Sequence, residues 1–433
     1  MKTLLLLITL LTITTAYARV VSPSSIEVKI FLISEFQTGD SGSARDLVLS
    51  QVKHLFGYMQ NPEIGPMYGL DANIAGIGAM RWEPEVQVLS DSKKNNVRTI
   101  RYQLDGFLLL NKKVADQLLP RGDWQITLPY DLDNYYDRNC TDPHYPERDD
   151  FWYFNMPFKR GCDHLRQEPL AKAVTARISP APKVPDLKVG LDVLRGDNGN
   201  GDAFQIASIN GFDKSSTDPN DDGRLNFLRM NDWFVQQGFK MSVLSRHKNR
   251  PVYLFEKTLQ RANGSEVRAR IIRLLADTDL GDTKRVTFAK FLKQALQESD
   301  VVVYEGHSGL GVNLDLKTIE RQLLFSKDKT VGDRIQFNRS KHQIFLFDSC
   351  TSYSYYLGMF TGKKDPGTLA VMSNGLASLF GYEIPTTQNL YSDLLDLEHQ
   401  TLSNDHLTWS KLLGNFERPL GANTFMLNVD INN

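Results

Sequence analysis

Two continuous apolar runs, Val301–Tyr304 and Ile344–Phe347, constrain the fold of this chain more than any other feature. Neither run alternates with polar residues, so a strand built from either one needs cover on both of its faces. Helices packed on both sides of a mainly parallel sheet give that cover. The two runs therefore predict an α/β domain with the strands at its centre.

Signals for strands and helices alternate along the second half of the chain. Strands are expected at residues 204–209, 239–244, 252–255, 267–275, 301–304, 344–347 and 368–372, and helices at residues 227–235, 288–295 and 314–324. Repeated strand, helix and strand units imply right-handed crossovers and neighbouring parallel strands. We expect this domain to cover residues 191–433.

The first half has a different pattern. Alternating apolar residues predict half-buried strands at residues 26–33, 100–104 and 124–128, and a four- and three-residue spacing predicts a helix at residues 48–59. These patterns predict an α+β or mainly β accessory domain of residues 19–176, and we find no catalytic pattern in its sequence. Three prolines between Ile178 and Pro185 disfavour a helix and predict a linker at residues 177–190.

The N-terminus resembles an export signal. Lys2 precedes an apolar stretch from Leu4 to Ile13, and Ala16-Tyr17-Ala18 fits a cleavage site, so residues 1–18 predict a signal peptide and a secreted or periplasmic protein. The apolar stretch is shorter than the roughly 20 residues that span a bilayer, which argues against a membrane anchor. A formal net charge of −1 gives no electrostatic case for binding nucleic acid or anionic membranes.

The chain has three cysteines, and export would expose them to an oxidising compartment. Cys140 and Cys162 are close in sequence and could close a disulfide loop. Cys350 would then remain single, as a reactive thiol, an intermolecular linker or a buried inert thiol. Its place after an apolar strand and before Thr351 and Ser352 favours a reactive, accessible thiol.

His307 and Cys350 each follow one of the two apolar runs. Reactive groups collect beyond the carboxyl ends of parallel strands, so both residues can reach one crevice. A nearby imidazole lowers the pKa of a thiol and can supply a proton to a departing amine. Backbone N–H groups of Gly309 and Cys350 could hold the oxyanion of a tetrahedral intermediate. This chemistry requires no cofactor.

The order of apolar strand, His and Gly, then apolar strand, small residue and Cys resembles the clan CD cysteine peptidases, which include caspases, legumains and gingipains. The resemblance covers roughly residues 200–380, and Ser308 departs from it by standing between His307 and Gly309. It implies a caspase-like endopeptidase that acts on polypeptides through an acyl-enzyme. By analogy with legumains, Asn210 would orient the histidine.

The resemblance also implies a pocket that recognises the side chain before the scissile bond. Glu305, Asp348, Ser373 and Asn374 could line it, and an acidic lining would favour Arg or Lys in the substrate. Each of these four residues could equally be a solvated loop residue, and Asn210-Gly211 is also a common turn sequence.

Three alternatives stay open. Acidic loops with Asp197, Asn200, Asp202, Asp218 and Asp221 have oxygen ligands at alternating positions and could bind calcium, although turns explain them as well. Gly306-His307-Ser308-Gly309 suggests a serine hydrolase, but Leu310 replaces the glycine that the motif needs. The chain could also be a catalytically inactive caspase-like scaffold that binds a surface partner.

Overall fold

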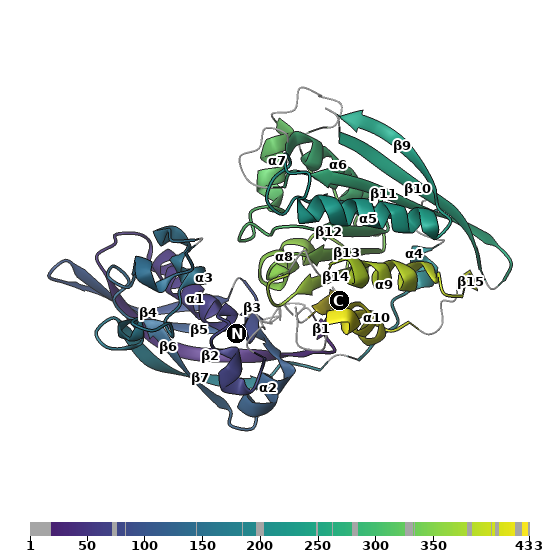
Figure 1. Ribbon diagram of the computed structural model, residues 1–433. Helices are drawn as coiled ribbons and strands as arrows, with labels where there is room; N and C mark the ends of the chain where they lie inside the picture. The colour runs from purple at the N-terminus through teal and green to yellow at the C-terminus, as the bar shows by residue number, and fades with distance from the viewer. Residues whose placement is uncertain are drawn as a thin grey trace, which may run out of the picture.

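The structure is a computed structural model, shown in Figure 1. It describes residues 19–71, 76–82, 84–143, 145–183, 185–195, 203–247, 250–261, 263–278, 285–324, 332, 334–378, 383–399, 401–402, 407–420 and 427–431. The predicted signal peptide lies outside these residues. Within them, no helix has the length and apolar character needed to cross a membrane.

The second half of the chain forms a ten-stranded mixed sheet with helices, which confirms the α/β class. Its five central strands are parallel and stand in the order β14, β13, β12, β8 and β11. Antiparallel pairings extend the sheet on both sides: β16 pairs with β14 and β1 with β16, while β10 pairs with β11 and β9 with β10. The strands are β1 (Arg19–Val21), β8 (Ala203–Gly211), β9 (Lys240–His247), β10 (Arg250–Arg261), β11 (Glu266–Ala276), β12 (Val301–Glu305), β13 (Gln343–Asp348), β14 (Leu369–Asn374), β15 (Thr401–Leu402) and β16 (Leu427–Ile431).

Helices cover both faces of this sheet, as the two apolar runs require. One face packs against α6, α7 and α8, and the other against α4, α5, α9 and α10. Successive side chains of β12 therefore enter different cores, Val302 one and Val303 the other. The helices are α4 (Leu191–Leu194), α5 (Asp222–Gln236), α6 (Arg285–Glu298), α7 (Leu316–Leu324), α8 (Ser352–Thr361), α9 (Glu383–Leu395) and α10 (Trp409–Glu417).

The N-terminal domain, built from β2 to β7, has a six-stranded antiparallel sheet and is α+β. Buried and more exposed positions alternate along its long strand β2, because helix α1 covers one face. Its elements are β2 (Ser25–Thr38), α1 (Ala44–Gln60), β3 (Gly78–Met80), β4 (Glu85–Lys94), β5 (Val97–Asn111), α2 (Lys112–Leu118), β6 (Asp123–Pro129), α3 (Phe151–Phe154) and β7 (Ala171–Pro180). The predicted disulfide between Cys140 and Cys162 is formed in the segment between β6 and β7.

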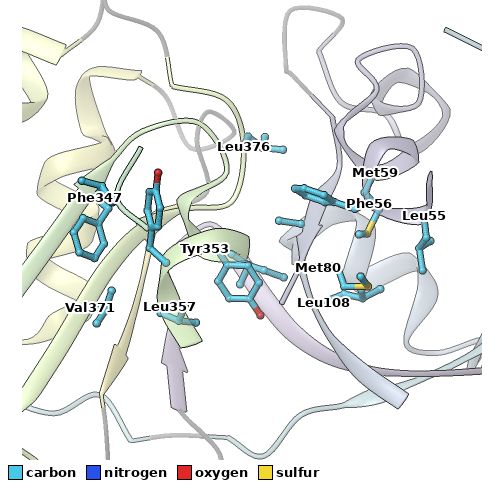
Figure 2. Close-up of a cluster of buried hydrophobic side chains, with 14 of the residues drawn as sticks. Leu55, Phe56, Met59, Met80, Leu108, Phe347, Tyr353, Leu357, Val371 and Leu376 are labelled. Atoms are coloured by element: carbon cyan, nitrogen blue, oxygen red, sulfur yellow. The ribbon is translucent and has the colours of Figure 1, made fainter. Parts of the chain in front are cut away.

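The two domains share one hydrophobic core rather than meeting through a loose linker. Phe56 and Met59 of α1 face Leu376 and the α8 residue Tyr353 across the boundary (Figure 2). Polar contacts join the same surfaces: the Tyr353 hydroxyl donates to a Glu27 carboxylate oxygen 2.7 Å away, and Arg81 pairs with that oxygen at 2.7 Å. The buried interface fixes the orientation of the two domains.

Two predicted domain limits differ from the structure. Arg19–Val21, placed in the N-terminal domain, pairs instead with β16 of the ten-stranded sheet, because three residues carry no pattern that identifies their partner strand. Strand β7 runs into the predicted linker and ends at Pro180, a position where the missing N–H of proline is tolerated.

Candidate active site

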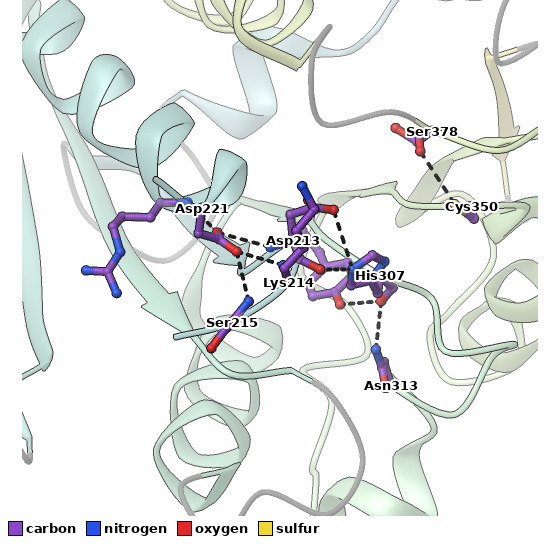
Figure 3. A network of polar contacts seen from close by, with 10 residues as sticks. Asp213, Lys214, Ser215, Asp221, His307, Asn313, Cys350 and Ser378 are labelled. Carbon is purple, nitrogen blue, oxygen red and sulfur yellow. Dashed lines mark hydrogen bonds and ion pairs between the residues drawn. The ribbon is translucent and has the colours of Figure 1, made fainter. Parts of the chain in front are cut away.

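His307 and Cys350 lie at the same edge of the ten-stranded sheet, as their sequence context predicts. Strands β12 and β13 are adjacent and parallel, and their last residues, Glu305 and Asp348, stand opposite each other. His307 and Cys350 each come two residues later, so the strand register places them on neighbouring segments (Figure 3). Both side chains are partly exposed.

The imidazole of His307 is held by the loop that follows β8. Its Nε2 lies 2.6 Å from the backbone carbonyl oxygen of Asp213, which can only accept a hydrogen bond, so Nε2 carries the hydrogen. The Asp213 carboxylate is 3.9 Å from the same nitrogen. In this neutral tautomer Nδ1 carries no hydrogen.

Asp221 fixes the loop that carries Asp213. Its carboxylate accepts hydrogen bonds from the N–H groups of Asp213, Lys214 and Ser215 at 2.7–3.1 Å, and it also caps α5 by accepting from Arg224 N–H. Burial raises the pKa of Asp221, but these four backbone donors outweigh it and the pKa is lowered. The loop whose Asp213 carbonyl binds His307 is therefore held in place by Asp221.

The His307 backbone belongs to a tight turn. Its carbonyl accepts from the Tyr304 hydroxyl at 2.6 Å and from the Asn313 side chain at 2.9 Å. Gly309 has a φ of 55°, and a Cβ there would lie 2.6 Å from the Asn313 side-chain oxygen, so glycine is required at this position. The unexpected Ser308 is buried in the same turn, and its carbonyl accepts from the Tyr356 hydroxyl at 2.8 Å.

The thiol of Cys350 contacts the loop that follows β14. Its sulfur donates to the backbone carbonyl of Ser378 at 3.5 Å, and the Ser378 hydroxyl donates to Asp348 at 2.8 Å. The side-chain amide of Asn374 donates to the same Asp348 oxygen at 2.6 Å. Asp348, at the end of β13, therefore holds the end of β14 through Asn374 and the following loop through Ser378.

Asn210 does not orient His307. Its amide donates to Glu305 at 2.5 Å, and its oxygen accepts from Arg273 at 2.9 Å, deep in the sheet. Asparagine at a buried strand end satisfies neighbouring polar groups, and the carbonyl of Asp213 holds the histidine instead. The analogy with legumains was wrong at this residue.

The four residues expected to line a specificity pocket are buried rather than open to substrate: Glu305, Asp348, Ser373 and Asn374 are each 2% exposed or less. Ser373 donates to Asn428 at 3.0 Å, and the other three bond to one another or to Asn210. Burial raises the pKa of both Glu305 and Asp348. Two buried carboxyl groups therefore stabilise the strand ends, and substrate recognition has to come from other residues.

The expected calcium ligands divide into two groups. Asp197, Asn200 and Asp202 lie outside the described residues. Asp221 uses both carboxylate oxygens on backbone donors, and Asp218 accepts from Asn220 N–H at 2.8 Å in a turn. The two described residues of this set, Asp218 and Asp221, are explained by turn and helix-cap chemistry.

One cluster of Asp137, Cys140 and His164 brings potential metal ligands together in the N-terminal domain. The Cys140 sulfur is bonded to Cys162 and cannot serve as a thiolate ligand. Asp137 and His164 form an ion pair at 3.1 Å when the histidine is protonated. This cluster gives no support for a metal site.

Comparison with known proteins adds no relative: the chain matches none of the protein-family models, and no curated protein is significantly similar to it in sequence. The geometry adds Asp213 and Ser378, which sequence reasoning missed. Both act through backbone carbonyl groups, which leave no residue-type signal. Only their position after parallel strands β8 and β14 could have drawn attention to them.

Proposed function

We propose that this protein is an exported cysteine endopeptidase of the caspase-like type, with Cys350 as nucleophile and His307 as general acid and base. The observation that carries the proposal is the arrangement of the pair at the ends of adjacent parallel strands, each residue held by a carbonyl group from a neighbouring strand-end loop. The disulfide between Cys140 and Cys162 supports an oxidising location.

The reaction follows from these groups. The Cys350 thiol gives its proton to His307, and its sulfur forms a bond to the peptide carbonyl carbon. The carbon–nitrogen bond then breaks, and His307 passes that proton to the departing amine. In this proposal the backbone N–H groups of Gly309 and Cys350 would donate to the oxyanion. Water then attacks the thioester, its proton passes to His307, and the carbon–sulfur bond breaks to release the acid and restore the thiol.

His307 can deliver that proton because of how it is held. The carbonyl of Asp213 accepts from Nε2, so any proton exchange with substrate would take place at Nδ1. The Asp213 carboxylate lies 3.9 Å from the same Nε2. The loop carbonyl therefore determines the tautomer of His307.

A peptidase probe with a thiol-directed electrophile tests the proposal on the exported protein. Wild type should be labelled at Cys350 and should cleave a mixed peptide library, whereas C350A should do neither. H307A should lose at least about 100-fold in peptide cleavage, because it removes general acid and base catalysis.

His399 provides the matched control, since it is an exposed histidine paired with Asp396 at 2.8 Å. H399A should label and cleave like wild type. Equal cleavage by wild type and C350A would refute the proposed function, and an unlabelled, inactive wild type would favour the inactive scaffold.

A further inference from the structure

The loop of residues 375–378 receives the Cys350 thiol, and one end of it is held by the N-terminal domain. The side-chain amide of Gln60, the last residue of α1, donates to the Gly375 carbonyl at 3.0 Å. The next residue, Leu376, packs into the shared core opposite Phe56 and Met59 of α1 (Figure 2). The start of this loop is therefore anchored across the domain boundary.

The other end of the loop meets the nucleophile. The N–H of Thr351 donates to the Leu376 carbonyl at 3.1 Å, and the Ser378 carbonyl accepts from the Cys350 thiol at 3.5 Å. Asp348 holds the Ser378 hydroxyl at 2.8 Å. Residues 375–378 thus connect the hydrogen bond from Gln60 at one end to the Ser378 carbonyl, which accepts from the Cys350 thiol, at the other.

Gln60 is well placed to act as a fixed anchor. Only 7% of its surface is exposed, and the same amide nitrogen donates to the Gly78 carbonyl of β3 at 2.5 Å. Two carbonyl acceptors favour this orientation of the amide, because rotating it away would break both hydrogen bonds. Its position is set by the N-terminal domain and passed on to Gly375.

A second part of the N-terminal domain also comes near the thiol. Burial raises the pKa of Tyr153, and the negative charge of the Cys350 thiolate adds to the rise. Tyr153 belongs to α3 and contacts Phe56 edge to face, with ring centres 5.9 Å apart. Phe56 in turn contacts Tyr355 of α8 at 5.9 Å. The domain boundary therefore runs beside the active site.

We propose that Gln60 is a positioning residue for the peptidase reaction and that the N-terminal domain is a permanent part of the active site, not a removable inhibitory segment. The inference rests on the proposed function. The hydrogen bond from Gln60 holds the Gly375 carbonyl in place. This contact limits where the loop of residues 375–378 can lie, and so fixes the Ser378 carbonyl that orients the Cys350 thiol.

Replacement of the anchor should affect the thiol and turnover in opposite directions. A carbonyl acceptor stabilises the neutral thiol, so a displaced loop should lower the thiol pKa. In Q60M, alkylation of Cys350 by iodoacetamide at pH 6 should become about 3-fold faster. Peptide kcat/KM should fall about 10-fold, because the nucleophile is no longer held in place. The pH profile of alkylation should shift to lower pH.

Gln51 gives a matched control on the same helix. It is fully buried, its amide donates to the Pro129 carbonyl and its oxygen accepts from the Tyr102 hydroxyl at 2.6 Å, all within the N-terminal domain. Q51M should lower the melting temperature by a similar amount but leave alkylation and kcat/KM within about 2-fold of wild type. Q60A serves as the second variant if Q60M does not fold.

The outcomes separate this inference from the proposed function. If turnover depends on Cys350 but Q60M and Q51M have the same alkylation profile and kcat/KM, the positioning role of Gln60 is refuted and the peptidase stands. If C350A cleaves as well as wild type, the peptidase itself fails.

Discussion

The two sheets of this protein bury their strands differently. All six residues of β13 in the ten-stranded sheet are buried, whereas buried positions alternate with more exposed ones along β2 in the six-stranded sheet. A parallel strand covered on both faces cannot present a side chain to substrate along its length. Its only accessible positions are just past its end, where His307 and Cys350 stand. The burial pattern explains why the two proposed catalytic residues follow the strands.

The largest difference should appear in stability. Leu346 of β13 is 1% exposed, and L346A should lower the free energy of unfolding by about 2–5 kcal/mol by leaving a cavity. Ile33 of β2 is 40% exposed, and I33A should cost about 0.5 kcal/mol or less. Urea denaturation of both variants measures the comparison, and equal costs would show that the two faces of β2 are covered in solution.

The second largest effect on stability should come from removing the disulfide, and it should be confined to the N-terminal half. Cys140 and Cys162 are 22 residues apart, and closing such a loop contributes about 3 kcal/mol in the chain-entropy account. The double variant C140S/C162S should lose about that much in calorimetric stability while Cys350 keeps its reactivity toward iodoacetamide. A loss of less than about 1 kcal/mol would indicate that the neighbouring buried residues hold this segment without the bond.

Much of the fold follows from local patterns. The continuous apolar runs predict β12 and β13, and the spacing of Val48, Val52 and Leu55 predicts α1, because burial of a strand or helix face imposes a period on the sequence. Partners are harder to predict. The pairing of Arg19–Val21 with β16 joins the first and the last described strands through backbone hydrogen bonds that any sequence could make.

The active site divides in the same way. The position of His307 and Cys350 at one edge of the sheet could be predicted because each follows an apolar strand, and their proposed role follows from the chemistry of their side chains. Asp213, Ser378 and Gly375 contribute carbonyl groups, so their residue types carry no signal. The pocket prediction for Glu305 and Asp348 failed because exposure at a strand end depends on the loops of neighbouring strands, which no single segment specifies.

Acid should destabilise the N-terminal domain through His54. Burial lowers the pKa of His54 to about 3, with the charge of Lys53 adding to the effect, and its ring contacts Tyr135 and Phe151 edge to face. The unfolded chain takes up this proton near pH 6.5, so stability falls as pH drops from 6.5 toward 3, by up to about 1.4 kcal/mol per pH unit.

H54F keeps an aromatic ring that cannot be protonated. It should therefore reduce the loss of stability between pH 6.5 and pH 3. Melting temperatures of wild type and H54F between pH 7 and 4 provide the measurement. Parallel curves for the two proteins would mean that His54 binds its proton equally well in the folded state.

The buried carboxyl group of Asp348 should have the opposite pH dependence and the smallest effect. Burial raises the pKa of Asp348, although Asn374 and Ser378 donate to it. The folded state therefore holds this proton more tightly than the unfolded state. The resulting stabilisation is present below the unfolded pKa of about 3.9 and is lost as pH rises through the folded pKa.

In D348N, whose side-chain oxygen can still accept both hydrogen bonds, the melting temperature relative to wild type should rise from pH 4 to pH 7. A constant difference would show that Asp348 has the same pKa in the folded and unfolded states. Together with H54F, this variant tests whether the two halves, joined by one core, respond to acid in opposite directions because one buries a base and the other an acid.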